Sequence, residues 1–115
     1  MNIININVDN SVFDKNSNHF KRLVDYSYLA DSLTVIIPYN KKEVLSVSDR
    51  LFIFGTGGKS KFFRLFNLYI IAKKIIFKDK YDVITVQDQY YLALIGWLLA
   101  RKFKIGLELQ IHGFE

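Results

Sequence analysis

Short runs rich in β-branched residues alternate along this chain with longer segments whose apolar residues recur at helical spacing. The short runs predict strands at residues 2–8, 33–37, 51–54, 82–86 and 107–111. The longer segments predict helices at 60–78 and 89–103, and a first helix after Ser17 with Phe20, Leu23, Val24 and Tyr28 on one face. The polar segment 39–50 predicts a loop. This order favours an α/β fold, a Rossmann-like, open and mostly parallel sheet with helices on both faces.

Size and composition narrow the functions open to the chain. Its 115 residues predict a single domain, residues 1–115. Cysteine is absent, which excludes disulfides, thiolate metal sites and cysteine nucleophiles, and we find no other metal-ligand cluster in the sequence. The first ten residues lack a signal-peptide pattern, and no apolar stretch reaches the ~20 residues that span a bilayer. We therefore expect a cytoplasmic protein, either soluble or peripheral on the inner face of the plasma membrane.

Ligands of a parallel sheet bind beyond the carboxyl ends of its strands. The segments that follow the predicted strands are 9–17, 55–60, 87–89 and 112–113. Ser17 is a candidate N-cap for the helix that follows it. Asp88 is expected to cap the next helix or to bind substrate hydroxyls, and one residue can do both. His112, followed by Gly113, is either a site residue or a hydrogen-bonded residue in a turn.

Residues 55–60, Gly-Thr-Gly-Gly-Lys-Ser, match a phosphate-binding loop only in part. The first glycine of a P-loop would fall at Ile53, inside a predicted strand. The last glycine of a Gly-x-Gly-x-x-Gly loop would fall at Ser60. The segment therefore predicts a flexible turn into a helix. An alternative stays open, in which free amides at the start of that helix hold an anionic group of a substrate.

The segment 59–80 concentrates the positive charge of the chain. It holds seven basic residues and one acidic residue, a net charge of +6, so the rest of the +5 chain sums to −1. Aromatic and aliphatic residues are interleaved with the basic ones, which is typical of a cationic helix that lies on an anionic membrane. The alternative is that the apolar face packs on the sheet and the lysines are solvated. Nucleic acid is not an expected partner, because no recognised binding module is present. The candidate membrane contacts are Lys59, Lys61, Arg64, Lys73 and Lys74.

The last third of the chain carries an ordered set of motifs. Residues 81–89 read Tyr-Asp-Val-Ile-Thr-Val-Gln-Asp-Gln, residues 91–105 are an apolar segment that includes Leu-Leu-Ala-Arg-Lys, and residues 107–113 end in His-Gly. In order and spacing, these motifs resemble a stretch of the family 4 glycosyltransferases. In that family a DVI-x-x-x-D strand end precedes an apolar helix ending LLARK, and a second strand then leads to a histidine. The first strand, its polar loop and the helix after Ser17 resemble the start of the same family, so the resemblance covers nearly the whole chain.

The resemblance implies the acceptor-side, N-terminal part of a GT-B enzyme. Such an enzyme transfers a sugar from a nucleotide-sugar donor with retention, and it needs no metal or other cofactor. His112 aligns with the family's strand-end histidine near the transferred sugar and is the expected catalytic residue. The acceptor side would be lined by Asp88, Gly113, Asn16 and Ser17. Segment 9–17 lacks the glycine pair that the family often has there, which argues against donor contact by this loop.

The resemblance also implies partners. A GT-B cleft needs a donor-binding C-terminal domain, or a partner subunit in its place, and this chain contains neither. We therefore expect a partial domain that is inactive alone, with a sugar or lipid-linked acceptor in the complete enzyme. The competing prediction is a non-catalytic Rossmann-like module whose cationic helix docks it on a membrane or on a partner.

Overall fold

The structure is a computed structural model, and it describes residues 2–7, 13–87 and 90–110. Strands and helices alternate in the order that the sequence predicts, with one additional strand. In chain order the elements are β1 (Asn2–Ile6), α1 (Asn18–Ser27), β2 (Ser32–Ile37), β3 (Lys42–Ser46), β4 (Leu51–Thr56), α2 (Lys61–Lys78), β5 (Val83–Gln87), α3 (Tyr90–Phe103) and β6 (Gly106–Gln110).

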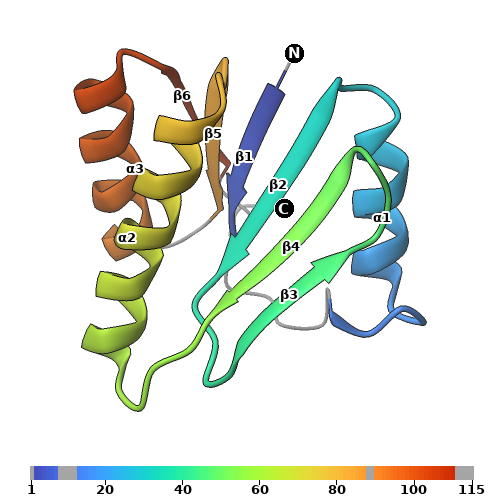
Figure 1. Cartoon of the computed structure of the whole chain (residues 1–115), viewed down its shortest axis with the longest axis horizontal. Helices are drawn as coiled ribbons and strands as arrows, with labels where there is room; N and C mark the ends of the chain where they lie inside the picture. The colour runs from blue at the N-terminus through green and yellow to red at the C-terminus, as the bar shows by residue number, and fades with distance from the viewer. Residues whose placement is uncertain (1, 8–12, 88–89, 111–115) are drawn as a thin grey trace.

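The strands form one six-stranded sheet in the order β3-β4-β2-β1-β5-β6. All neighbouring strands run parallel except β3, which is antiparallel to β4. The central strand β1 pairs Ile4 with Thr34 of β2 on one side and with Ile84 of β5 on the other. The predicted Rossmann-like α/β sheet, mostly parallel and with helices on both faces, is confirmed (Figure 1).

The loop predicted at 39–50 is wrong in part, because Lys42–Ser46 forms the edge strand β3. The strand pairs along its length with β4, from Lys42 opposite Thr56 to Ser46 opposite Phe52. Most of its side chains are exposed, so the apolar alternation that marks a half-buried strand is missing from its sequence. The pairing partner, rather than local propensity, makes this segment a strand.

Helices cover the two faces of the sheet unequally. On one face, α1 packs Phe20 and Leu23 against Val35 of β2 and Ile53 of β4. Tyr28, predicted to lie on this apolar face, is 70% exposed, because α1 ends at Ser27 and Tyr28 forms its C-cap. On the other face, α2 and α3 share a core with the central strands, built by α2 residues Leu68, Ala72 and Ile76, α3 residues Leu99 and Ala100, and strand residues that include Ile4, Ile6, Ile84 and Val86.

One glycine sets how closely α3 approaches the sheet. A Cβ atom added at Gly96 would lie 2.5 Å from Cγ2 of Val86 and 3.4 Å from Cδ1 of Leu107. Val86 is almost completely buried in β5. Because Gly96 has a hydrogen atom in place of a methyl group, α3 can pack closely on β5 and β6 at this point.

Candidate functional site

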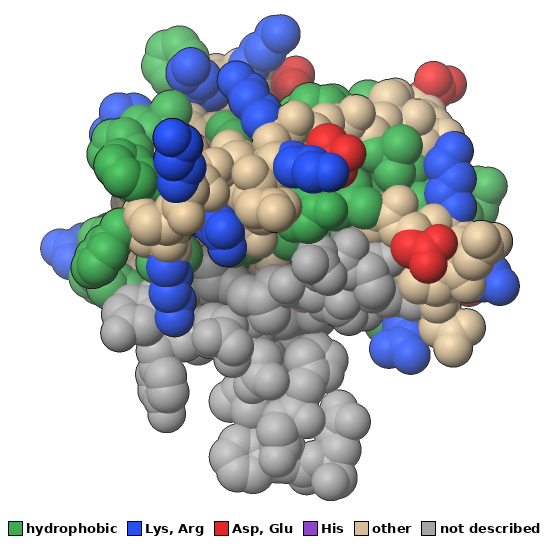
Figure 2. Space-filling model, turned by 90° about the horizontal axis from the view of Figure 1, so that it is seen from below, with side chains coloured by type: hydrophobic (Ala, Val, Ile, Leu, Met, Phe, Trp, Pro, Cys, Tyr) green, Lys and Arg blue, Asp and Glu red, His purple; other side chains and the backbone are tan. Residues whose placement is uncertain are grey.

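The parallel strands β1, β2 and β4 end at one edge of the sheet, which is viewed end-on in Figure 2. The chain leaves this edge through Asn7 after β1, Pro38 after β2 and the glycine turn after β4. Asn7 is 1% exposed and is hydrogen-bonded through its backbone N–H to the carbonyl of Ile36, 3.2 Å away. This is the edge at which a parallel sheet binds ligands, and it is the candidate functional site of the chain.

The turn between β4 and α2 needs its two central glycines. Gly57 and Gly58 have φ angles of 72° and 122°, which side chains of L-residues disfavour. A Cβ atom at Gly58 would also lie 3.0 Å from the backbone nitrogen of Arg64. The turn therefore brings the backbone of the β4 end close to the first turn of α2.

Side chains of α2 hold this turn from behind. Nε of Arg64 donates to the carbonyl of Gly58 at 3.0 Å, and Nδ2 of Asn67 donates to the carbonyl of Gly57 at 3.3 Å. On the strand side, Oγ1 of Thr56 accepts from the backbone N–H of Tyr39 at 3.1 Å. The ends of β2 and β4 and the start of α2 thus form one hydrogen-bonded unit.

Arg64 offers a guanidinium group that can bind an anion at this edge. It is half-buried and lines a small cavity of about 280 Å³ together with Pro38, Tyr39 and Asn40. Only its Nε has a hydrogen bond among the described residues, so the two terminal nitrogens are available to a ligand there. Guanidinium nitrogens in this arrangement bind carboxylate or phosphate oxygens. Arg64 lies at the carboxyl edge of the sheet, and its contact with a membrane stays a prediction.

The start of α2 is capped by its own chain. Ser60 is the N-cap, and its Oγ accepts from the backbone N–H of Phe63 at 3.4 Å. Lys59 and Lys61 flank this serine and are exposed. The cap takes one of the amide donors at the start of α2, so fewer of them are left for an anionic ligand.

A buried polar pair joins β1 and β5 near the same edge. Nδ2 of Asn5 donates to Oγ1 of Thr85 at 2.7 Å, and the two residues are register partners. Oδ1 of Asn5 is buried and accepts no hydrogen bond in the structure. Buried acceptors are usually satisfied, and one left unmade costs about 1–3 kcal/mol. No sequence pattern marked Asn5, since an asparagine inside an apolar run gives no sign of which face it occupies.

The residues predicted for the acceptor side are only partly within the described chain. Ser17 is the N-cap of α1, as predicted, and its Oγ accepts from the backbone N–H of Phe20 at 3.1 Å. Asn16 is exposed, and its backbone N–H donates to Oδ1 of Asp14 at 3.0 Å. Asp88, His112 and Gly113 lie outside the described residues.

An outer surface of α2 and α3 forms a second candidate site. Neither helix contains an acidic residue, whereas together they carry Lys61, Arg64, Lys73, Lys74, Lys78, Arg101 and Lys102. Several large apolar side chains project from it into solvent. We call this surface the α2–α3 outer face and define it by Phe62, Phe63, Phe66, Lys73, Phe77, Leu94, Trp97, Leu98 and Arg101.

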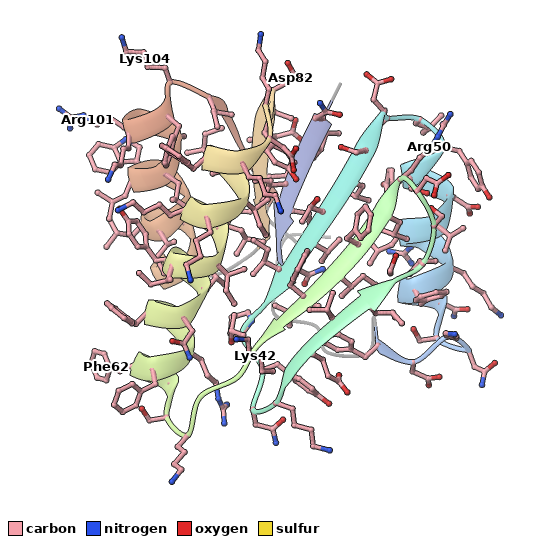
Figure 3. All side chains as sticks on the ribbon, in the orientation of Figure 1. Lys42, Arg50, Phe62, Asp82, Arg101 and Lys104 are labelled. Atoms are coloured by element: carbon pink, nitrogen blue, oxygen red, sulfur yellow. The ribbon has the colours of Figure 1, made fainter. Side chains whose placement is uncertain are left out.

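Exposure on the α2–α3 outer face is extreme for aromatic residues. Phe62 and Phe77 are 87% and 85% exposed. Phe62 and Arg101 point away from the sheet in Figure 3, and the Arg101 guanidinium lies 5.3 Å from the Trp97 ring centroid. Basic and apolar side chains gather on the α2 side of the molecule in Figure 2, and the acidic side chains visible in that view lie outside this area.

Neither a spanning helix nor a metal cluster is found in the described parts of the chain. Within residues 2–7, 13–87 and 90–110, no helix combines the length and apolar character needed to cross a membrane. The same residues contain no group of three or more histidine, cysteine or carboxylate side chains that could hold a metal ion.

Comparisons with known proteins address the fold. No family model matches the sequence, and no curated protein matches it. Among solved structures, sucrose-phosphate synthase from Thermosynechococcus elongatus matches with a TM-score of 0.69 and 16% identity, over 98% of this chain and 64% of that one. UDP-GlcNAc 2-epimerase from Methanocaldococcus jannaschii matches with a TM-score of 0.57 and 18% identity, over 95% of this chain and 31% of that one. These likenesses support a GT-B-type fold. The chain spans less than two thirds of either structure, and its place in family 4 stays a prediction.

Proposed function

We propose that this chain is the acceptor-side lobe of a retaining glycosyltransferase that moves a sugar from a nucleotide-sugar donor to an acceptor. The observation that carries the proposal is the likeness of nearly the whole chain to part of a sucrose-phosphate synthase, joined to the motif order at residues 81–113. A GT-B cleft forms between two lobes, so the partner in this proposal is a donor-binding domain or subunit. The acceptor is a sugar or a lipid-linked sugar.

The roles at the carboxyl edge follow from chemistry. His112 would contact the transferred sugar and stabilise charge as the glycosidic bond breaks. Asp88, Gly113, Asn16 and Ser17 would line the acceptor side. Arg64, with its two terminal nitrogens available beside the glycine turn, would bind an anionic group of the acceptor.

The test joins this chain to a donor-binding Rossmann-like domain, taken from a continuing or adjacent reading frame that encodes one. We expect transfer from a labelled nucleotide sugar by the joined protein, retention of the anomeric configuration by NMR, and no transfer by the 115-residue chain alone. His112→Ala should lower kcat by about 100-fold, the typical cost of one lost group that stabilises transition-state charge.

The matched control is His19→Ala, which alters the other histidine of the sequence and should leave kcat unchanged. Turnover that survives His112→Ala would remove the catalytic assignment. A joined protein that transfers no sugar from any of the common nucleotide sugars would refute the proposed function.

We also propose that the α2–α3 outer face docks the domain on an anionic membrane. Two observations favour this second candidate: the exposed aromatic side chains, and the absence of any acidic residue from the two helices that carry them. Aromatic rings enter the headgroup layer while basic side chains meet anionic lipid. Of the predicted contacts, Lys73 lies on this face, and Lys59, Lys61 and Lys74 are also exposed on or beside α2.

Vesicle sedimentation tests the membrane proposal. The chain should bind vesicles of phosphatidylcholine with phosphatidylglycerol, release them at high salt, and ignore phosphatidylcholine alone. The double variant Phe62→Ser, Lys73→Ser removes one ring that the membrane would bury and one positive charge. Together these contribute about 3 kcal/mol to the free energy of membrane binding, so binding should fall about 100-fold. The matched variant Lys21→Ser, Tyr26→Ser changes one cation and one exposed aromatic residue on α1, and it should bind like the original chain. Equal loss in both double variants would contradict docking through the α2–α3 outer face.

A further inference from the structure

A cavity of about 650 Å³ lies at the opposite edge of the sheet from the candidate functional site. Asn2 and Ser32, the first residues of β1 and β2, line it, and so does Tyr81, which precedes β5. Figure 3 marks this amino edge of the sheet by the labels Asp82 and Lys104. The cavity extends from this amino edge along the sheet face to Phe54, two residues before the end of β4, and the proposed sugar transfer uses none of its lining residues.

The floor of the cavity is aromatic. Phe52 and Phe54 stand two residues apart on β4, so both rings project from the sheet face on which α2 lies. Ile75 of α2 forms the adjoining wall. Both phenylalanines are only partly buried, because α2 does not cover this half of the sheet. An apolar group of a ligand could bury this surface.

Two hydroxyl groups lie side by side at the end of the cavity. Oγ1 of Thr34 and the phenolic oxygen of Tyr81 lie 3.0 Å apart and share one hydrogen bond, whichever of them donates. Neither hydroxyl has a second hydrogen bond within the described residues, so the hydrogen that the pair does not use can be donated to a ligand in the cavity. Burial raises the pKa of the Tyr81 phenol, which keeps it protonated at neutral pH.

The rim of the cavity is cationic. Lys74 and Lys78 are four residues apart on α2 and so lie on one side of the helix, and Lys80 follows the helix end. Asp79 is the one acidic side chain among the lining residues. None of the three lysines is in an ion pair within the described residues. Lys74, predicted as a membrane contact, thus faces this cavity.

We propose that this cavity binds an amphipathic phosphate ester, with the phosphate held by Lys74, Lys78 and the Thr34–Tyr81 hydroxyl pair and the apolar body lying on Phe52 and Phe54. The volume suits a small organic ligand, since binding pockets commonly measure about 300–1,000 Å³. Three lysines against one aspartate select an anion, and the aromatic floor distinguishes an ester with an apolar body from free phosphate. Such an ester is either a soluble metabolite or the headgroup end of a lipid.

Isothermal titration of the 115-residue chain with octyl phosphate tests the proposal. We expect octyl phosphate to bind at least about tenfold more tightly than inorganic phosphate, which lacks the apolar body, and than octyl glucoside, which lacks the charge. Lys74→Ala and Lys78→Ala should each weaken binding about fivefold to tenfold. Lys21→Ala is the matched control, because it removes an exposed lysine of α1 that does not line the cavity, and it should change binding less than about twofold.

Several results would overturn the proposal. Equal affinity for octyl phosphate and inorganic phosphate would show an anion site without selection for an apolar body. Equal losses in Lys21→Ala and Lys74→Ala would show attraction by overall charge. Tyr81→Phe keeps the ring and removes the hydroxyl, so it should weaken the binding of octyl phosphate and leave the binding of octyl glucoside unchanged. A Tyr81→Phe variant that binds both ligands as before would contradict the hydroxyl contact.

The source of the ligand is resolved by a second arm of the same experiment. Vesicles that contain phosphatidic acid should compete with octyl phosphate if a lipid supplies the ester, and Lys74→Ala should then lose this competition while Lys21→Ala keeps it. If the chain binds octyl phosphate and vesicles do not compete, the natural ligand is a soluble metabolite. Neither arm measures sugar transfer, so failure here and failure of the proposed function are separate results.

Discussion

Gly96→Ala should destabilise the domain, although alanine is the better helix former. The substitution gains about 1 kcal/mol of helix propensity. Against this, the new methyl carbon would lie 2.5 Å from Cγ2 of Val86, well inside van der Waals contact. Val86 is buried and β-branched, so its methyl group cannot turn away easily. Overpacking of this kind costs typically 1–3 kcal/mol, and with the propensity gain we expect a net loss of up to about 2 kcal/mol in the free energy of unfolding.

Urea denaturation followed by circular dichroism measures this loss. Gly106→Ala is the matched control, because the nearest atom to its added Cβ is the Asp82 carbonyl oxygen at 3.4 Å, and it should change stability by less than about 0.5 kcal/mol. Adding Val86→Ala to Gly96→Ala makes room for the new methyl group, so the double variant should be more stable than the two single losses predict together. Higher stability in Gly96→Ala than in the original chain would refute the close approach of α3 to β5.

Three other predictions concern single polar groups. Ser17→Ala removes the N-cap of α1 and should lower the free energy of unfolding by about 1 kcal/mol, measured by urea denaturation. Thr85→Val leaves the buried amide of Asn5 without its acceptor and should cost about 1–3 kcal/mol, whereas Thr85→Val combined with Asn5→Leu removes both partners and should recover most of that loss. The pKa of Tyr81 is raised in the folded protein, above all by burial, so the unfolded chain loses its phenolic proton first. Stability should therefore be intact below about pH 10 and fall as the pH rises through the folded pKa, and thermal melts of Tyr81→Phe should show a smaller fall.

Most of the fold follows from local patterns in the sequence. The apolar runs that end in Ile37 and Val86 are too hydrophobic to face water, and helical segments between them leave a parallel sheet as the arrangement that buries both faces. The edge strand β3 could not be found in this way, because an edge strand with solvated side chains has the composition of a loop. Its pairing with β4 is a tertiary property.

The candidate site was predictable in position and less so in its residues. The strand-end rule located the glycine turn, and Ser17 was identified as a cap from its residue type and its place before an apolar helix. The hydrogen bond of Arg64 to the glycine turn was not predicted, because the sequence of a cationic helix does not show which neighbour each basic residue contacts. Its hydrogen bond to Gly58 depends on two positive φ angles in the turn, and these become visible only in the folded backbone.

The strand β3 also decides where this sheet can grow. Lys42 and Glu43 place exposed charged side chains on the two faces of this edge strand, which runs antiparallel to β4, its one neighbour in the described sheet. An incoming chain would have to desolvate those charges to pair there. Extension of the sheet by a further strand is therefore directed to the far margin beside β6.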